Sequence, residues 1–313
     1  MPSFDQILHQ LPQQLVIALN QGAIYALIAI GYTMVYGVLR LINFAHGDVY
    51  MIGSYAGFYA AGGLGVTLLL KEGQAAPFGA VLLIFLIAMI ASAAIGIAIE
   101  RFAYRPLRNA SRLSALITAI GVSMLLEYGG QGIFSPARQP FPDLIPRVFL
   151  IKSPLLTVSL KQVIIIGVSV VLMVGLSFFV MKTRAGRALR AIALDRSAAS
   201  LMGINTDRVI ALTFALGSAL AAAAGILNAV DKGGIEPLMG LMVGLKAFVA
   251  AVIGGIGSIS GAALGGLIMA LAEMLVVLLG QSKYQDAVTF TLLILVLVFR
   301  PGGLMGSYAP EKV

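Results

Sequence analysis

Long apolar runs separated by short charged connections make up most of this sequence. Hydrophobic residues account for 59% of the 313 positions and charged residues for only 11%, whereas a soluble domain carries about 25% charged residues. A membrane-spanning helix needs about 20 apolar residues, and runs of that kind recur along the whole chain. The sequence therefore predicts an all-α polytopic membrane protein, with residues 1–313 forming a single transmembrane domain.

The apolar runs predict about nine membrane-spanning segments, within a range of about eight to ten. The last run is short, the connection between the seventh and eighth is very tight, and the helix near residues 40–55 is a candidate for a break. No clear tandem repeat is visible. We expect segments near 13–39, 48–70, 78–99, 113–134, 160–181, 208–230, 238–257, 260–280 and 285–299.

Basic residues predict how the segments are oriented, because cytoplasmic connections are enriched in Lys and Arg. One basic cluster follows the third segment and another follows the fifth, so one orientation satisfies both. It places the N-terminus outside and the C-terminus in the cytoplasm, and only the connection 135–154 conflicts with it. This bias accounts for the net charge of +8, and we expect no nucleic-acid partner. The clusters are Arg101, Arg105, Arg108 and Arg112, and then Lys182, Arg184, Arg187, Arg190, Arg196 and Arg208.

A polar stretch, Asn43–Tyr55, interrupts the apolar runs early in the chain. One interpretation is a break inside the membrane, where unwound backbone and polar groups line a path for a solute. The other is a turn at the membrane surface, in which Asn43 caps a helix end and Asp48 stabilises the start of the next helix. Both interpretations stay open at this point.

Three ionisable residues, Glu127, Lys246 and Glu273, lie inside predicted segments. If the tight turn lies near Ser258, Lys246 is about 18 Å and Glu273 about 22 Å from it along adjacent antiparallel helices. Glu127 lies about 15 residues beyond Arg112 and hence at a similar height. We expect a buried ion pair or network in the outer half of the membrane; a pair that only fixes the helix register is the alternative.

The longest basic interruption, Lys182–Gly203, predicts a helical connection on the cytoplasmic side. Arginines recur three apart from Arg184 to Arg190 and share one side of a helix. Gly203 is suited to end this helix, and Asn205 or Thr206 to cap the next one. Two roles stay open, namely an orientation signal held to anionic lipid headgroups and a surface for a cytoplasmic partner.

The sequence offers no site for catalysis. It contains no cysteine and only two histidines, His9 and His46, which excludes thiolate and multi-histidine metal sites. It also lacks a G-x-x-x-x-G-K-[ST] phosphate loop, so the chain does not hydrolyse ATP by that device. The serines of Gly257–Gly261 have no histidine in a later segment to activate them. We therefore expect no enzyme, no metal site and no cofactor in this chain.

Three segments together resemble the membrane permease subunit of an ATP-binding-cassette importer of the branched-chain amino acid type. In that class a Glu-Ala-Ala-x-x-x-Gly-like signature docks a short cytoplasmic helix into the ATPase subunit. Here the signature falls on Ser197, Ala198, Ala199 and Gly203, and Asp195 is a candidate for the missing acid. Asp48 and Ser260 also depart from the glutamate and proline of many relatives. The three segments are Asn43–Tyr55, Arg190–Asn205 and Gly244–Ser258.

The resemblance implies that the chain forms half of a translocation pathway for branched-chain or related amino acids, with amides and urea as further candidates. It implies a second related permease, two cytoplasmic ATPase subunits that carry ATP and magnesium, and an extracytoplasmic solute-binding protein. The location would be the bacterial cytoplasmic membrane. The implied coupling residues, in the connection 182–207, are Arg190, Asp195, Arg196, Ser197, Ala198, Ala199 and Gly203. The implied pathway residues are Asn43, His46, Asp48, Tyr50 and Ser54.

The main alternative is an autonomous secondary transporter or a channel for a small polar solute. In that case Glu127, Lys246 and Glu273 would form an ion-coupled site. The basic connection would then only orient the chain.

Overall fold

The computed structural model describes residues 3–72, 74–108, 110–146 and 148–306. Within this part of the chain, seven helices are long and apolar enough to cross a membrane, in line with the predicted polytopic helical architecture. The α-helices are α1 (Phe4–Leu39), α2 (His46–Gly63), α3 (Val66–Lys71), α4 (Phe78–Ile99), α5 (Arg112–Phe134), α6 (Leu160–Lys182), α7 (Arg184–Leu194), α8 (Arg196–Leu201), α9 (Thr206–Lys232), α10 (Met239–Gly254), α11 (Ile259–Leu278) and α12 (Gln285–Phe299).

Two of the nine predicted segments do not form long apolar helices, so the predicted count is not reached on this measure. The segment expected at 48–70 is divided at Gly65, whose φ of 71° lies in the left-handed region, into α2 and α3. With His46 and Asp48 in its first turn, α2 is also too polar to be one of the seven helices that are apolar enough to cross a membrane. The segment expected at 238–257 contains α10, whose 16 residues extend about 24 Å, less than the hydrocarbon thickness of about 30 Å.

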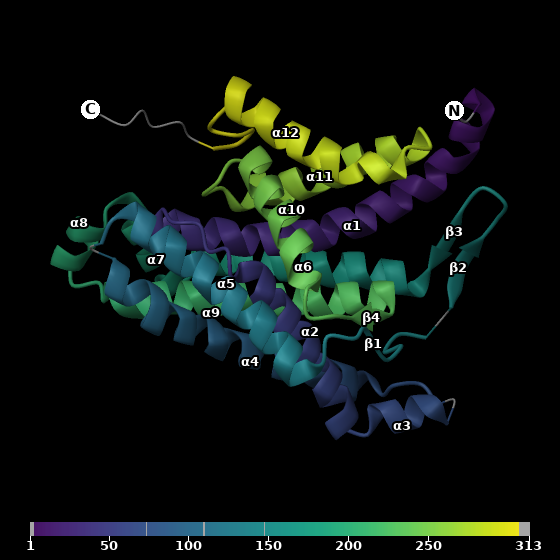
Figure 1. The fold of residues 1–313 in the computed structure, drawn as a ribbon, viewed down its shortest axis with the longest axis horizontal. Helices are drawn as coiled ribbons and strands as arrows, with labels where there is room; N and C mark the ends of the chain where they lie inside the picture. The colour runs from purple at the N-terminus through teal and green to yellow at the C-terminus, as the bar shows by residue number, and fades with distance from the viewer. Residues whose placement is uncertain (1–2, 73, 109, 147, 307–313) are drawn as a thin grey trace.

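Helix α1 forms the centre of the molecule, and α9, α10, α11 and α6 pack around it (Figure 1). Every residue from Ala23 to Ile30 is buried. Small residues allow this close packing. A side chain on Gly22 or Gly266 would meet the neighbouring backbone, since Gly22 lies against Leu267 and Gly266 against Ala26. The core therefore depends on contacts between the first helix and the last third of the chain.

The fold consists of two halves that run in opposite directions (Figure 1). In the first half the C-terminal cap of α1 is Arg40, and in the second the C-terminal cap of α9 is Gly233. Both cap residues adopt the left-handed conformation. A short irregular stretch follows each, and then α2 or α10 begins. The packing is reciprocal, because α1 contacts α10 and α11 while α9 contacts α2 and α4. Inverted halves of this kind are common among membrane transporters.

The polar stretch after α1 folds back into the helical bundle instead of forming a surface turn. His46 lies against Gly31, which is eight residues, or about 12 Å, before the end of α1. Asn43, Ala45 and His46 are all buried. The hydroxyl of Tyr104 donates to the Ile42 carbonyl (3.3 Å) and to Asn43 Oδ1 (3.1 Å), which satisfies part of the unwound backbone. The stretch therefore lies inside the helical bundle; that it lines a path for a solute stays a prediction.

Helices α2 and α10 begin side by side. Gly47, the second residue of α2, packs against Gly240, the second residue of α10, and also against Gly244. A Cβ on Gly47 or Gly240 would overlap the backbone of the other helix. Glycine at both positions therefore lets the two half-helices start in direct contact, and from there they run toward opposite ends of the molecule (Figure 1).

Short strands lie at the end of the molecule that carries the N-terminus (Figure 1). β1 (Gln139–Pro140) pairs antiparallel with β4 (Gly234–Ile235), and β2 (Phe149–Lys152) pairs antiparallel with β3 (Thr157–Ser159). The first pair ties the connection between α5 and α6 to the entrance of α10. The second forms a projecting hairpin. The sequence analysis predicted no strands here.

Candidate functional site

The connection between α6 and α9 forms two short helices at the end of the molecule opposite the N-terminus (Figure 1). Thr183 Oγ1 accepts a hydrogen bond from the Gly186 N–H (3.0 Å) and begins α7. Gly186 packs on the Val180 carbonyl, where a Cβ has no room, so α7 folds tightly back against the end of α6. The predicted helical connection is present, divided into α7 and α8.

Helix α8 carries the Ala-Ala-x-x-x-Gly pattern and is closed at both ends. Asp195 Oδ1 accepts a hydrogen bond from the Ala198 N–H (3.0 Å) and caps its start. Gly203, with a φ of 82°, ends it, and Asn205 Oδ1 then accepts from the Arg208 N–H (3.0 Å) to cap α9. The acid two residues before Ser197 therefore has a structural function as a helix cap.

Large apolar side chains project from this element. Leu194 is 83% exposed, Leu201 89% and Met202 83%, while Ala199 is buried beneath them. Ser197 and Ala198 are exposed beside them. We call six of these residues the α8 tip, namely Leu194, Ser197, Ala198, Ala199, Leu201 and Met202. Apolar groups exposed together on a short capped helix are typical of a protein contact.

An ion network joins the base of this element to the end of α4. The network contains Glu100, Arg105, Arg108 and Asp207. Arg105 Nη2 lies 2.9 Å from Glu100 Oε2 and Arg105 Nη1 lies 3.7 Å from Asp207 Oδ2. Arg108 pairs with both carboxylates. Glu100 is fully buried in a π-helical turn, η1 (Glu100–Tyr104), and Asp207 is in the first turn of α9.

This network was not predicted from the sequence, where the two arginines were interpreted only as orientation signals. The signal available in the sequence was Glu100, an acid directly before a basic connection at the end of an apolar run. Asp207, the other carboxylate that the arginines bind, lies 107 positions beyond Glu100 and has no signal of its own.

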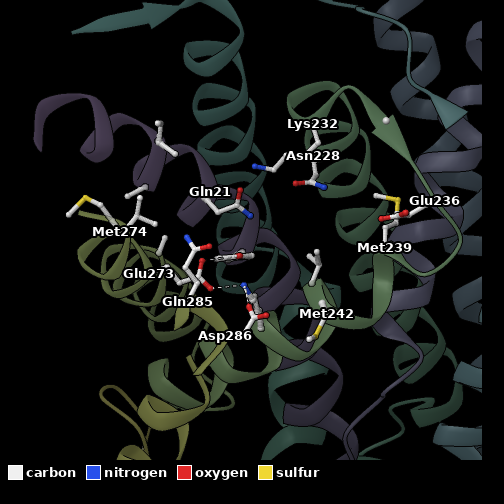
Figure 2. Close-up of a pocket in the computed structure, with 18 of the residues that line it drawn as sticks. Gln21, Asn228, Lys232, Glu236, Met239, Met242, Glu273, Met274, Gln285 and Asp286 are labelled. Carbon is white, nitrogen blue, oxygen red and sulfur yellow. Dashed lines mark hydrogen bonds and ion pairs between the residues drawn. The ribbon is translucent and has the colours of Figure 1, made fainter. Parts of the chain in front are cut away.

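A cavity of about 640 Å³ opens between α1, α9, α10, α11 and α12 (Figure 2). Its lining includes the carboxylates of Glu236, Glu273 and Asp286, the cations Arg138, Lys232 and Lys246, and the amides Gln21, Asn228 and Gln285. In Figure 2, Glu273, Gln285 and Asp286 lie on one side and Asn228 and Lys232 lie across from them. The lining is thus polar, mixed in charge and contributed by both halves of the fold.

Two of the three predicted intramembrane ionisable residues meet in this cavity. Lys246 Nζ lies 2.9 Å from Glu273 Oε1 and 2.7 Å from Asp286 Oδ1. Glu273 also accepts hydrogen bonds from the hydroxyls of Tyr25 (3.2 Å, to Oε2) and Thr289 (3.0 Å, to Oε1). Residues from three other helices, α1, α10 and α12, therefore surround this buried carboxylate of α11.

The third residue, Glu127, lies elsewhere. It is buried on α5 and contacts the side chain of Asp48 on α2, to which Ser123 Oγ also donates a hydrogen bond (2.5 Å). The two acids thus share one site between α2 and α5.

The predicted pathway residues lie in the core around the start of α2. Asn43, His46, Asp48, Tyr50 and Ser54 are all buried, and none of them lines the 640 Å³ cavity. His46 packs edge-on against Tyr32 at 4.6 Å between ring centroids. Ser54 Oγ donates to the Tyr50 carbonyl (3.1 Å). Their contact with a solute stays a prediction.

Comparisons with known proteins identify the family. Residues 14–297 match the family model described as "Branched-chain amino acid transport system / permease component". The high-affinity branched-chain amino acid transport system permease protein BraD of Pseudomonas aeruginosa is 46% identical over 311 residues, covering 98% of this chain and 99% of the relative. The corresponding LivH of Escherichia coli K12 is 45% identical, covering 99% of each chain.

A more distant relative is the probable branched-chain amino acid transport permease protein LivH of Methanocaldococcus jannaschii, 28% identical over 304 residues, which cover 92% of this chain and 90% of the relative. No solved structure shows a significant match. The match to the family model covers most of the chain, and the bacterial relatives match it over nearly their whole length. The chain belongs to the family of branched-chain amino acid transport system permease components.

Proposed function

We propose that this protein is a permease subunit of an ATP-driven importer in the bacterial cytoplasmic membrane. It forms half of the translocation pathway for branched-chain or related amino acids. The proposal is supported by the names of the full-length relatives, which are permease proteins of branched-chain amino acid transport systems. The chain itself is a transport component without a phosphate-loop motif, so we place ATP and magnesium on partner subunits.

The proposed complex contains a second related permease, two cytoplasmic ATPase subunits and an extracytoplasmic solute-binding protein. The observation that carries the ATPase contact is the α8 tip. Leu201 and Met202 project into solvent from a helix that Asp195 and Gly203 close at its two ends. Burying two such side chains in a partner groove contributes about 1.5–3 kcal/mol each.

The proposed orientation places the N-terminus outside and the C-terminal end of α12 in the cytoplasm. The basic residues of the connection after α4 and those of α7 lie at one end of the molecule, together with the end of α12 (Figure 1). The N-terminus and the β2–β3 hairpin lie at the other end. Because Lys and Arg are enriched on the cytoplasmic side, the arrangement supports this orientation. In this orientation the hairpin faces outward, and we propose that the solute-binding protein docks there.

The coupling follows from how the α8 tip is attached. Closure of the ATPase subunits displaces α8 as a rigid body, since capped helices do not stretch. Asp207 in the first turn of α9 and the buried Glu100 at the end of α4 are joined through Arg108. A displacement of α8 is therefore passed to α9 and α4 together, and tilting of these helices alternates access to the pathway.

Reconstitution of the complex tests this proposal. Wild-type complex in proteoliposomes is expected to take up L-leucine only with ATP and binding protein. Leu201→Glu places a charge on the α8 tip and is expected to abolish co-purification with the ATPase subunits and uptake together. Leu155→Glu, on the exposed turn of the hairpin at the opposite end, is the matched control for ATPase binding. Uptake by the permease alone, driven by an ion gradient, would refute the proposal.

A further inference from the structure

The 640 Å³ cavity contains an ion pair that is only partly satisfied within the chain. A lysine ammonium has three N–H donors. In the described part of the chain, two donors of Lys246 have partners, Glu273 and Asp286, so one donor is available to a further acceptor. Lys246 lines the cavity, and a carboxylate placed there would meet that donor.

The two acids beside Lys246 differ in how far they are satisfied. Glu273 is buried and accepts from Lys246, Tyr25 and Thr289. Asp286 has a side chain that is 52% exposed, and its Oδ1 is bound to Lys246. Its Oδ2 has no hydrogen-bonding or ion-pair partner among the described residues, and Asp286 lines the cavity (Figure 2). An ammonium group placed there would meet an unsaturated carboxylate oxygen.

These two positions are adjacent, since Lys246 Nζ and Asp286 Oδ1 are 2.7 Å apart. A ligand that satisfies both therefore carries a carboxylate and an ammonium group close together, as an α-amino acid does on its α-carbon. Resting on the proposed function, we propose that the cavity is a transit site in which the zwitterionic head group of an α-amino acid pairs with Lys246 and Asp286.

The rest of the lining fits an aliphatic side chain. Met239, Met242 and Met274 line the cavity with Val243 and Val277. Methionine is flexible and polarizable and adapts to apolar groups of different shape, which suits side chains of several branched lengths. The volume of about 640 Å³ falls within the range of about 300–1,000 Å³ that is usual for small-molecule sites.

Charge balance explains why such a site holds its ligand only briefly. Lys246, Glu273 and Asp286 are already paired with one another before the ligand arrives, so the ligand gains only one charged contact from Lys246 and one from Asp286, and its binding stays weak. A zwitterion has no net charge, and its entry leaves the charge of the cavity unchanged. A transport pathway needs binding that is strong enough for entry and weak enough for exit, and this arrangement meets both conditions.

Single-cysteine labelling tests the site directly, because the natural chain contains no cysteine. Met242→Cys reports on the cavity, and Leu155→Cys reports on the hairpin outside it. The complex of both permeases and the ATPase subunits is purified without the binding protein. The rate of maleimide labelling of this chain is measured with and without L-leucine, in the nucleotide-free and the ATP-bound forms. Uptake of L-leucine by the wild-type complex with binding protein is measured in parallel.

The expected result is that saturating L-leucine slows labelling of the cavity cysteine and leaves that of the hairpin cysteine unchanged. Asp286→Asn keeps the size of the side chain and leaves Lys246 paired with Glu273. It is expected to raise the L-leucine concentration needed for protection by about tenfold or more, since one charged contact is lost. Glu72→Gln, at an exposed carboxylate that does not line the cavity, is the control. L-Leucinamide and 4-methylpentanoate, which each lack one charge of the head group, are expected to protect weakly.

Two outcomes would overturn the site while leaving the proposed function intact. In the first, the wild-type complex transports L-leucine with ATP, yet L-leucine protects the cavity cysteine in neither form. In the second, protection is equal in the Asp286→Asn variant and for the two single-charge analogues. Absence of ATP-dependent uptake by the wild-type complex would instead overturn the proposed function.

Discussion

Replacing Arg108 with methionine tests how strongly the ion network holds α4 to α9. The side chain of Arg108 is 5% exposed and pairs with the fully buried Glu100 and with Asp207. Methionine fills a similar apolar volume but provides no charge. In the variant, Glu100 remains buried with a single cationic partner, Arg105, at 2.9 Å.

The magnitude follows from the burial of Glu100. Removing one partner of a buried ion pair costs about 3–5 kcal/mol, because a buried charge is left uncompensated. Arg105 compensates part of that charge, so we expect a loss of about 2–3 kcal/mol in the free energy of unfolding. For a chain of this size, that corresponds to a fall of about 3–5 °C in the unfolding temperature.

The assay is heat-induced unfolding of the detergent-purified permease, compared among four proteins. These are the wild type, Arg108→Met, Glu100→Gln and the double variant. In the double variant no buried carboxylate remains in this ion network. Adding Arg108→Met to Glu100→Gln is therefore expected to lower the free energy of unfolding by about 1 kcal/mol or less. Arg101 is an exposed arginine in the π-helical turn of Glu100, and Arg101→Met controls for the general loss of a positive charge.

Two results would refute this role of Arg108. In the first, the losses of unfolding free energy caused by Arg108→Met and Glu100→Gln simply add in the double variant. In the second, the Arg108→Met variant unfolds at the same temperature as the Arg101→Met control. Either result would mean that Glu100 does not depend on Arg108 for its charge compensation. The proposed transmission of motion from α9 to α4 would then lack its connecting residue.

Three further predictions concern single positions. Gly47→Ala is expected to lower the free energy of unfolding by about 1–3 kcal/mol or more, because its Cβ would overlap α10. Gly62→Ala, whose Cβ has open space, is expected to be neutral in the same unfolding assay. Gly203→Ala is expected to weaken ATPase binding and uptake, since alanine in the left-handed conformation costs about 1 kcal/mol, while Gly175→Ala, in open space within α6, leaves both unchanged. Thr289→Val removes one hydrogen bond to the buried carboxylate of the cavity and is expected to lower stability by about 1 kcal/mol, measured by the same unfolding assay.

Local patterns were sufficient to predict the long helices. Seven predicted segments each correspond to one long apolar helix, because length and apolarity alone define such a helix. The capping of α9 by Asn205 and the end of α8 at Gly203 also follow from local residue chemistry. In each case the residues that determine the structure lie within a few positions of one another.

Features that depend on distant contacts could not be predicted in the same way. The inverted halves leave no visible repeat, since their meeting point requires only glycine at positions such as Gly47 and Gly240. The pairing of Lys246 with Glu273 was accessible because a tight turn joins their helices. Glu127 was placed by height alone, and height does not say which neighbouring helix a residue faces, so its contact with Asp48 was not foreseen.

The central position of α1 has a consequence for how the protein is made. This helix is synthesised first, yet its buried face, including Tyr25, is covered largely by α9, α10 and α11, which leave the ribosome about 200 residues later. At a translation rate of about 5–20 residues per second, α1 waits about 10–40 seconds in the membrane without its partners. The core around α1 is therefore complete only after α11 has inserted, and a chain interrupted before Glu273 would leave much of the buried face of the first helix uncovered.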